Sequence, residues 1–481
     1  MRTTPSRGYL TLLALVFGSI FFMVLGALSS FVLIENRAED VSRLRSKAFA
    51  IAEAGLEYYR WHLLHYPNDM QNGTGQPGPY EIPVDDPEGG AVGVATLSIA
   101  ANTACGQTNS ISIISAGAPT EDPTVKRVLT ARYAQPSVAA YSYIINDNVW
   151  AGSDRIISGP YHANGGIRMD GTANAPVTSS VSTWLCTSSY GCNGIGGNPP
   201  TNSTQNGVFG AGPNQTLWQY PIPQMNFAAI SANFSNLKTI AEESGLYLAR
   251  YSSGSSSNSH RGYHLIFNSN GTVTVKRVSA VNTSLTSKPV DGSSGSFIHD
   301  YTLIVTESAY NTYDIPEDCG LIFVEDNTWI EGIIPSKITV VIANVTTTGV
   351  VPVGVLHGNI QYAATDGSDG LTVIAQKNLL IAPDSPTDMT LNGVFIAQSG
   401  AFGRNLYSCS GSYDPRGTLT ILGTTVSYKR TGTKWVNGCG GGNAGGYQVR
   451  IDAYDRNLAA DPTPFTPVVS TDFEFVEWRE Q

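Results

Sequence analysis

The first hydrophobic feature of the chain is an apolar run from Tyr9 to Ile34 that contains no charged residue. A short polar leader (1–8) with Arg2 and Arg7 precedes it. As a helix, a run of about 26 residues would be roughly 39 Å long, enough to cross a hydrocarbon core of about 30 Å. It is too long for a cleaved secretory signal, whose apolar core has about 7–15 residues. We therefore expect a retained membrane span over 9–34, with the N-terminus in the cytoplasm because of the two arginines.

Beyond the membrane span the pattern becomes that of an amphipathic helix, and the first proline after the leader is Pro67. Apolar residues recur at intervals of three and four, the spacing that lines one face of a helix. These residues are Leu44, Ala48, Ala52, Leu56, Tyr59 and Leu63. We predict one helix from Tyr9 to near His65, apolar all round in its first half and two-faced over 35–66. A plain anchor does not need that second half, whereas a helix packed against a globular head does.

After Pro67 the pattern is that of β structure. In two regions, short apolar bursts separated by Gly, Asn and Asp recur about every 15–25 residues, the spacing of rungs in a parallel β-solenoid. A β-sandwich is the alternative, with strands every 8–12 residues or so. Between the two regions, 226–249 reads as a helix with Ile230, Phe234, Leu237 and Ile240 on one face and Gly245 as its stop.

A hairpin at Asn270–Gly271 follows that helix. Near the end, a strand from Tyr447 to Tyr454 is followed by three prolines that disfavour helix, and a last strand ends at Glu480. The expected fold class is α+β, mainly β. The expected parts are a leader (1–8), an N-terminal helix (9–66), a β-rich linker region (67–140), a first β-solenoid part (141–224), a small α/β insertion (225–310), a second β-solenoid part (311–430) and a C-terminal β tail (431–481).

Composition narrows the function classes. Charged residues are 14% of the chain, well below the usual value of about 25%. The net charge of −10 and the absence of a long basic run disfavour nucleic-acid binding. All six cysteines follow the apolar run, and an even number in an exported domain favours disulfides. Spacing pairs Cys186 with Cys192 and Cys409 with Cys439, while Cys105 and Cys319 each stand alone and form the pair with least support. Without a Cys-x-x-Cys or His-x-x-x-His pair, we do not expect a zinc site.

Catalytic motifs are absent from the sequence: no Gly-x-Ser-x-Gly, His-Glu-x-x-His or phosphate loop occurs. We expect no enzymatic activity and no cofactor. Asp366 and Asp369, in a loop that also reads as a simple turn, are the one Ca²⁺ candidate. Asp384 and Asp388 are a second carboxylate pair, of the kind that β-solenoid enzymes acting on polysaccharides use. The histidines His162, His264, His299 and His357 are scattered over different predicted strands and turns, and we expect ordinary hydrogen-bonded roles for them.

The N-terminal segment resembles the type IV pilin family, and specifically the minor pilins of the PilX kind. The leader ends at Gly8, the large Tyr9 follows, and "KAFAIAEAGLEYYRW" (47–61) matches the segment that leads the helix into the head. The resemblance implies that a prepilin peptidase cuts between Gly8 and Tyr9, and that the retained helix packs against other pilin subunits. The helix-packing positions would be Leu13, Leu44, Ala48, Ala52 and Leu56.

One position departs from the family pattern. Most pilins carry glutamate at the fifth residue of the mature chain, and here that residue is Leu13. The departure favours a minor or tip subunit, or a protein that is never incorporated.

The resemblance places the chain first in the cytoplasmic membrane and then in a cell-surface filament. Its head would face a host surface, another cell or a glycan. The competing hypothesis is a membrane-anchored extracellular β-helix protein that binds or degrades polysaccharide.

Overall fold

The computed structural model describes residues 8–66, 69–194, 199–251, 261–409, 411–436, 438–440, 444–470 and 472–481. The chain forms two compact units. The first comprises Met1–Ala101, Ile111–Tyr133 and Glu477–Gln481, and the second comprises Asn102–Ser110 and Ala134–Val476.

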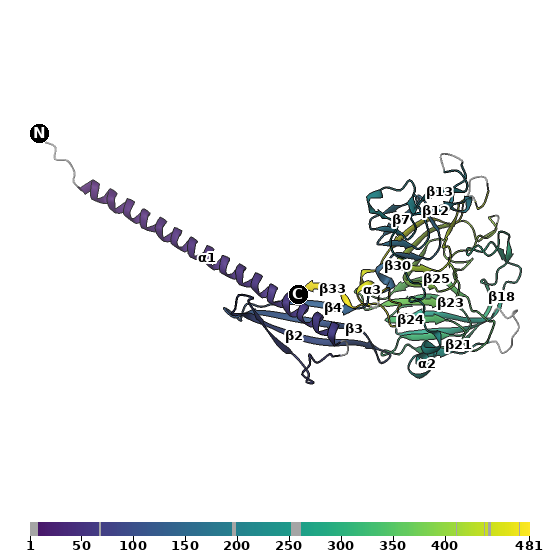
Figure 1. The fold of residues 1–481 in the computed structure, drawn as a ribbon, viewed down its shortest axis with the longest axis horizontal. Coiled ribbons are helices and arrows are strands. Elements are labelled where there is room, and N and C mark those ends of the chain that lie inside the picture. The colour runs from purple at the N-terminus through teal and green to yellow at the C-terminus, as the bar shows by residue number, and fades with distance from the viewer. Residues whose placement is uncertain are drawn as a thin grey trace. The chain divides into compact units, whose positions relative to one another are not determined.

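The first unit begins with α1 (Gly8–His65), an uninterrupted helix of 58 residues, drawn in purple in Figure 1. It confirms the predicted long N-terminal helix, because the apolar run and the amphipathic segment form one element. Leader residues 1–7 lie outside the described part of the chain, and Gly8 is the first residue of α1.

The first unit also contains a five-stranded sheet in the order β1-β2-β3-β4-β33. The pairs β1–β2 and β3–β4 are antiparallel. Its strands are β1 (Tyr80–Asp85), β2 (Ala91–Ala104), β3 (Gln107–Pro119), β4 (Arg127–Ala134) and β33 (Glu474–Glu480). The predicted linker region is therefore a folded sheet, and part of the predicted C-terminal tail supplies its fifth strand.

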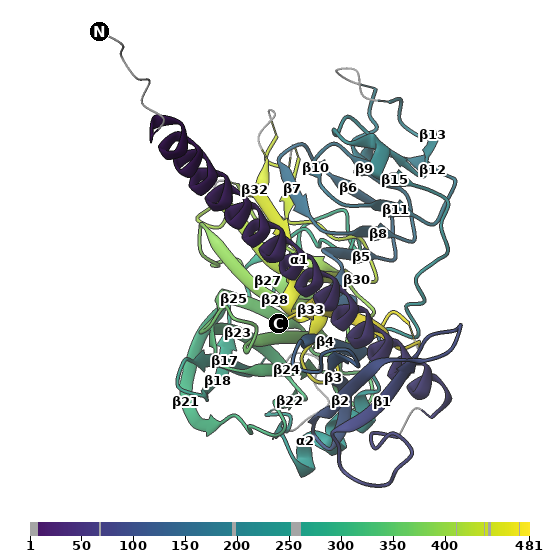
Figure 2. The ribbon, with the colours of Figure 1, turned by 90° about the vertical axis from the view of Figure 1, so that its left-hand side faces the viewer.

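The second unit is β-rich and is built mainly from parallel pairs. One ladder runs β16-β22-β24-β26-β28-β30-β5-β8-β11, each neighbour parallel to the next. A second ladder runs β17-β23-β25-β27-β29, and a third runs β30-β32-β7-β10. In Figure 2, β8 lies between β5 and β11, as its two pairings require. Among the described strands of this large sheet, antiparallel pairing is confined to β17–β18, β18–β21 and β31–β32, unlike a β-sandwich.

The strands of the second unit divide at helix α2 (Phe234–Glu243). Before it come β5 (Tyr143–Ile145), β6 (Val149–Ala151), β7 (Arg155–Ser158), β8 (Tyr161–Ala163), β9 (Ile167–Met169), β10 (Thr172–Ala173), β11 (Val177–Ser179), β12 (Thr183–Cys186), β13 (Ser203–Asn206), β14 (Val208–Phe209) and β15 (Trp218–Gln219). After it come β16 (Leu246–Leu248), β17 (Gly262–Asn268), β18 (Thr272–Val281), β19 (Thr286–Ser287), β20 (Ile298–His299), β21 (Ile304–Asp314), β22 (Leu321–Val324), β23 (Asn327–Ile334) and β24 (Lys337–Ile342). The remainder are β25 (Gly354–Tyr362), β26 (Gly370–Ala375), β27 (Leu379–Ile381), β28 (Met389–Ala397), β29 (Phe402–Gly403), β30 (Arg416–Ser427), β31 (Lys434–Trp435) and β32 (Gly445–Ala453).

Apolar side chains from one face of successive strands fill the core of the second unit. Leu265, Ile330 and Leu356 lie on three neighbouring strands and belong to one buried cluster. The residues next to them on the same strands, His264 beside Leu265 and Glu331 beside Ile330, point to the opposite face because side chains alternate along a strand.

Three details of the second unit correct the sequence analysis. The predicted insertion (225–310) is not separate, because β16 and β17 pair in parallel with β22 and β23; the hairpin at Asn270–Gly271 is confirmed as β17–β18. The helix is shorter than 226–249, because the Asn233 side chain accepts from Asn236 N and caps α2 there. A short helix, α3 (Arg456–Ala460), precedes the three prolines; Asp455 caps it.

Candidate functional site

The apolar half of α1 has the length and composition of a membrane span. Its most apolar window has a mean hydropathy of 2.4 and no buried residue, and it lies on the one helix among the described residues with this property. Leu13 is 47% exposed, and Tyr9 at the start of the helix is 73% exposed. This surface is open to lipid or to other apolar helices.

The second half of α1 packs on the sheet of the first unit. Ala48, Ile51, Ala52, Leu56 and Tyr59 are all buried. They match the predicted apolar face, with Ile51 as an addition.

Small residues let the helix and the sheet approach closely. A Cβ at Gly117 of β3 would lie 2.1 Å from Ala48 O and 2.4 Å from Ala52 N. On the helix, a Cβ at Gly55 would lie 2.7 Å from the Ala95 Cβ of β2. Gly117 therefore lets the backbone of β3 lie directly on the helix backbone, and Gly55 lets side chains of the sheet lie against the helix backbone. The sequence pattern identified the helix face but not Gly117, because a lone glycine in a strand does not reveal what lies against it.

The predicted helix-packing residues thus divide into two groups. Ala48, Ala52 and Leu56 are buried against this chain's own sheet, and Leu44 is half-buried. Leu13 alone of the five is exposed and free for contacts with lipid or with another molecule. The amphipathic half packs on this chain's own sheet, and the apolar half stays exposed.

Ion pairs fix the edge of the packed region. Arg43 Nη1 and Lys47 Nζ lie 2.8 and 2.7 Å from the two carboxylate oxygens of Glu121. Their hydrogen bonds, that of Lys47 first, lower the pKa of the Glu121 carboxyl. On the same helix, Phe49 contacts Trp478 of β33 edge to face, with ring centroids 5.8 Å apart.

The end of α1 is held by the turn that follows it. Tyr59 donates its hydroxyl proton to Asp69 O at 2.9 Å, and His62 Nε2 lies 2.8 Å from Asp69 Oδ2. Hydrogen bonds to the Asp69 carboxylate, first from Gln71 N and then from His62, lower its pKa. A charged Asp69 therefore stabilises the exit from the helix.

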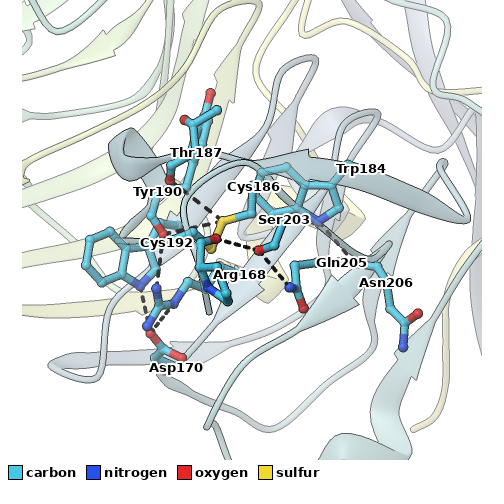
Figure 3. The surroundings of a disulfide bond; sticks show 12 residues. Arg168, Asp170, Trp184, Cys186, Thr187, Tyr190, Cys192, Ser203, Gln205 and Asn206 are labelled. Carbon is cyan, nitrogen blue, oxygen red and sulfur yellow. Dashed lines mark hydrogen bonds and ion pairs between the residues drawn. A yellow bond between two sulfur atoms is a disulfide. The ribbon is translucent and has the colours of Figure 1, made fainter. Parts of the chain in front are cut away.

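The second unit contains three disulfides, Cys105–Cys319, Cys186–Cys192 and Cys409–Cys439. These are the pairs named from the sequence. The Cys186–Cys192 bond lies in a packed pocket (Figure 3): Trp184 meets the Tyr190 ring edge to face at 5.3 Å and donates from Nε1 to Asn206 O. A disulfide that closes such a short loop restrains the local turn.

The carboxylates predicted for calcium serve as turn caps. Asp366 Oδ1 accepts from Ser368 N at 3.0 Å, and the buried Asp369 accepts from Ala364 N at 2.5 Å. Asp388 similarly accepts from Thr418 N. The Ca²⁺ assignment stays a prediction.

Two of the scattered histidines come together in the fold. The rings of His264 and His357 lie 4.9 Å apart, and both approach Glu331. Burial lowers the pKa of His357, but its hydrogen bonds to Asp384 and Glu331 outweigh burial and raise the pKa to about 9. The rings of His264 and His357, both close to its carboxylate, lower the pKa of Glu331. Sequence reasoning missed this cluster because its members come from three strands far apart in the chain.

The other two histidines have separate surroundings. His162 is buried between Thr178 Oγ1 and Asn164 Oδ1, each 3.0 Å from one ring nitrogen. His299 stacks on Tyr301 at the surface.

Comparison with known proteins adds little. No family model matches the chain, and no curated protein matches it. Among solved structures, it is similar to the competence-associated pilin ComZ from Thermus thermophilus, at 12% identity and a TM-score of 0.28, over 91% of this chain and 98% of that chain. A TM-score of that size does not establish a shared fold, so nothing about this chain follows from it.

Proposed function

We propose that this chain is a pilin-like structural subunit, a minor or tip pilin of a type IV pilus or related filament. It enters the cytoplasmic membrane with its N-terminus inside, a prepilin peptidase cuts it between Gly8 and Tyr9, and other pilin subunits then bind the exposed part of α1. The proposed role is structural and adhesive rather than enzymatic, and it needs no cofactor.

The observation that carries the proposal is the division of α1 into two halves within one helix. The half from Tyr9 to Ile34 is exposed and apolar, while the half around Ala48 and Ala52 is buried on the sheet. Association of apolar helices in lipid depends on close side-chain packing rather than on a hydrophobic driving force. A helix fixed to a folded unit at one end can therefore exchange lipid for neighbouring helices at the other without refolding.

The residue at the fifth mature position supports a minor or tip role. Leu13 stands there, and the first acidic residue of the helix is Glu35. A carboxylate among apolar helices is tolerated when it is paired. A subunit with no neighbour above it has no such pair to make, which agrees with leucine at this position.

The head is proposed to be a β-solenoid that displays a binding surface. The parallel ladders of the second unit support this, since each strand pairs with one from the next turn of the chain. The proposed ligands are a cell surface or a glycan.

The mature N-terminus tests the proposal. Mass spectrometry of the chain purified from its own cells is expected to find Tyr9 as the first residue. Gly8→Phe is expected to block cleavage and to keep the chain out of sheared filaments. Gly295→Phe is the matched control, because Gly295 lies outside α1 and a Cβ there meets no atom of this chain within 4 Å.

The same measurement distinguishes the competing hypothesis from the pilin proposal. A membrane-anchored polysaccharide-binding protein would keep Met1 and be unaffected by Gly8→Phe. Finding the intact chain in membranes, and none of it in purified filaments, would refute the pilin proposal.

A further inference from the structure

The cluster of His264, Glu331 and His357 lies on the outer face of three consecutive parallel strands. His264 is on β17, Glu331 on β23 and His357 on β25, and Figure 2 shows these strands as neighbours. Among the described residues, this is the group of three whose potential metal-ligating atoms lie within 4.8 Å of one another.

The distances inside the cluster fit a tetrahedral metal. His264 Nε2 lies 3.3 Å from Glu331 Oε1, and His357 Nδ1 lies 3.2 Å from Glu331 Oε2. Zinc binds histidine nitrogen and carboxylate oxygen at about 2.0–2.2 Å, which places two ligands of a tetrahedral site about 3.3 Å apart. The two histidine–carboxylate separations therefore need little adjustment to receive an ion.

One ligand atom is buried and lacks a hydrogen bond. His264 is 2% exposed, and its Nε2 has no hydrogen-bond partner in the described part of the chain. Its other nitrogen, Nδ1, lies 2.8 Å from Glu307 Oε2 on β21. With the proton on Nδ1 and donated to Glu307, Nε2 directs a lone pair at the centre of the cluster.

The second histidine has the same arrangement. His357 Nε2 lies 3.4 Å from Asp384 Oδ2, so a proton on Nε2 faces Asp384 and the Nδ1 lone pair faces Glu331. Histidines that bind metals commonly give their other N–H to a carboxylate, which fixes the ring and its tautomer. Both histidines of this cluster have such a carboxylate, Glu307 on β21 and Asp384 in the turn after β27.

The backbone makes room for the glutamate. The register of β23 and β25 shifts between Ile330 and Gly332, where Gly332 pairs with Ile360. At Gly358, within this irregularity, a Cβ would lie 2.0 Å from Glu331 Oε2. Glycine there allows the carboxylate to sit against the strand.

The charge of the surroundings suits a cation. Glu307, Glu331 and Asp384 supply three negative charges, and Lys276 pairs with Glu307 at 2.5 Å. Arg416 adds a further positive charge whose field reaches Asp384. Once the ion displaces the proton of His357, two neutral histidines and one carboxylate face it, with one position left for water.

From this geometry we propose that His264, Glu331 and His357 bind a divalent transition metal, Zn²⁺, that joins three consecutive strands of the head. Nitrogen ligands exclude Ca²⁺ and Mg²⁺, which take oxygen ligands. Glu307 and Asp384 are positioning residues that hold the two rings.

The test is titration of Zn²⁺ into the full chain, purified in detergent and stripped with a chelator, by isothermal calorimetry. The wild type is expected to bind one equivalent. Glu331→Gln and His357→Gln are each expected to weaken binding at least 100-fold, and Glu307→Gln by about 10–100-fold. The control His299→Gln, an exposed histidine outside the cluster, is expected to bind as the wild type does.

A second measurement does not depend on any variant. X-ray absorption at the zinc edge of the loaded wild type is expected to show two imidazoles and oxygen ligands, without sulfur. Absence of stoichiometric binding would overturn the proposal, as would unchanged binding in folded Glu331→Gln and His357→Gln, or a spectrum with fewer than two imidazoles.

Discussion

At the scale of single residues, the junction between β32 and β7 contains a buried ion pair. Arg155 Nη2 lies 2.7 Å from Asp452 Oδ2, with 4% and 3% of the two side chains exposed. Tyr143 donates to the other carboxylate oxygen at 3.0 Å and lies under the guanidinium. These contacts join β7 to β32. Removal of the Asp452 carboxylate would leave both Arg155 and Tyr143 without this partner.

We expect Asp452→Ala to destabilise the second unit by about 3–5 kcal/mol, because it leaves the buried Arg155 charge without its partner. Urea unfolding measures the loss. The control Asp366→Ala removes an exposed turn carboxylate and should cost far less. Equal effects of the two substitutions would show that the ion pair does not stabilise this junction.

The neighbouring pair predicts a pH dependence. Arg450 donates to both oxygens of Asp154 at 2.8 and 2.9 Å, and Lys434 lies 3.4 Å away. Burial raises the pKa of Asp154, but the hydrogen bonds and charges of Arg450 and Lys434 outweigh it and lower the pKa. A lowered pKa in the folded state stabilises the fold above the unfolded value of about 3.9 and loses that effect as pH falls through the folded pKa.

The wild type should therefore exceed Asp154→Asn in free energy of unfolding at neutral pH, and the difference should shrink below about pH 4. Urea unfolding at several pH values gives this difference directly. A difference that stays constant from neutral to acidic pH would contradict the assigned role of the carboxylate charge.

At the scale of elements, the contact between α1 and β3 depends on Gly117. We expect Gly117→Ala to destabilise the first unit by about 1–3 kcal/mol, because its Cβ would meet Ala48 O at 2.1 Å and the helix backbone must move away. Thermal unfolding in detergent measures the change. Gly295→Ala is the matched control, since a Cβ there meets nothing within 4 Å. An unchanged midpoint for Gly117→Ala would mean that the helix is held by other contacts.

Elements defined by local pattern could be predicted from the sequence, and those defined by distant pairing could not. The α1 helix follows from its periodicity, and the β17–β18 hairpin follows from Asn270–Gly271. The limits of α2 were missed because Asn226 accepts from Ala228 N and Ala229 N in a turn of its own.

Distant pairing explains the other differences. The ladder joins β30 to β5, so strands near residue 425 lie beside strands near residue 143. The histidine–glutamate cluster depends on the register of three strands, and the packing of Gly117 depends on what lies across from it. No local pattern contains this information.

At the scale of the whole molecule, the three disulfides close loops of very different length. Cys105 and Cys319 are 214 positions apart, and Cys186 and Cys192 are 6 apart. Because a crosslink removes more entropy from the unfolded chain when its loop is longer, Cys105–Cys319 should contribute about 3 kcal/mol more to the free energy of unfolding than Cys186–Cys192. We expect Cys105→Ser/Cys319→Ser to lower the denaturation midpoint more than Cys186→Ser/Cys192→Ser. The reverse order would show that packing around Trp184, rather than chain entropy, dominates.

The sheet of the first unit contains one strand, β33, that follows the second unit in sequence. Arg127 of β4 pairs with Glu480 of β33 across 353 positions of sequence, so the sheet beneath the helix gains its outer strand only after the entire head has been made. Without β33, β4 would become an unpaired edge strand, and such an edge tends to pair with strands of other chains.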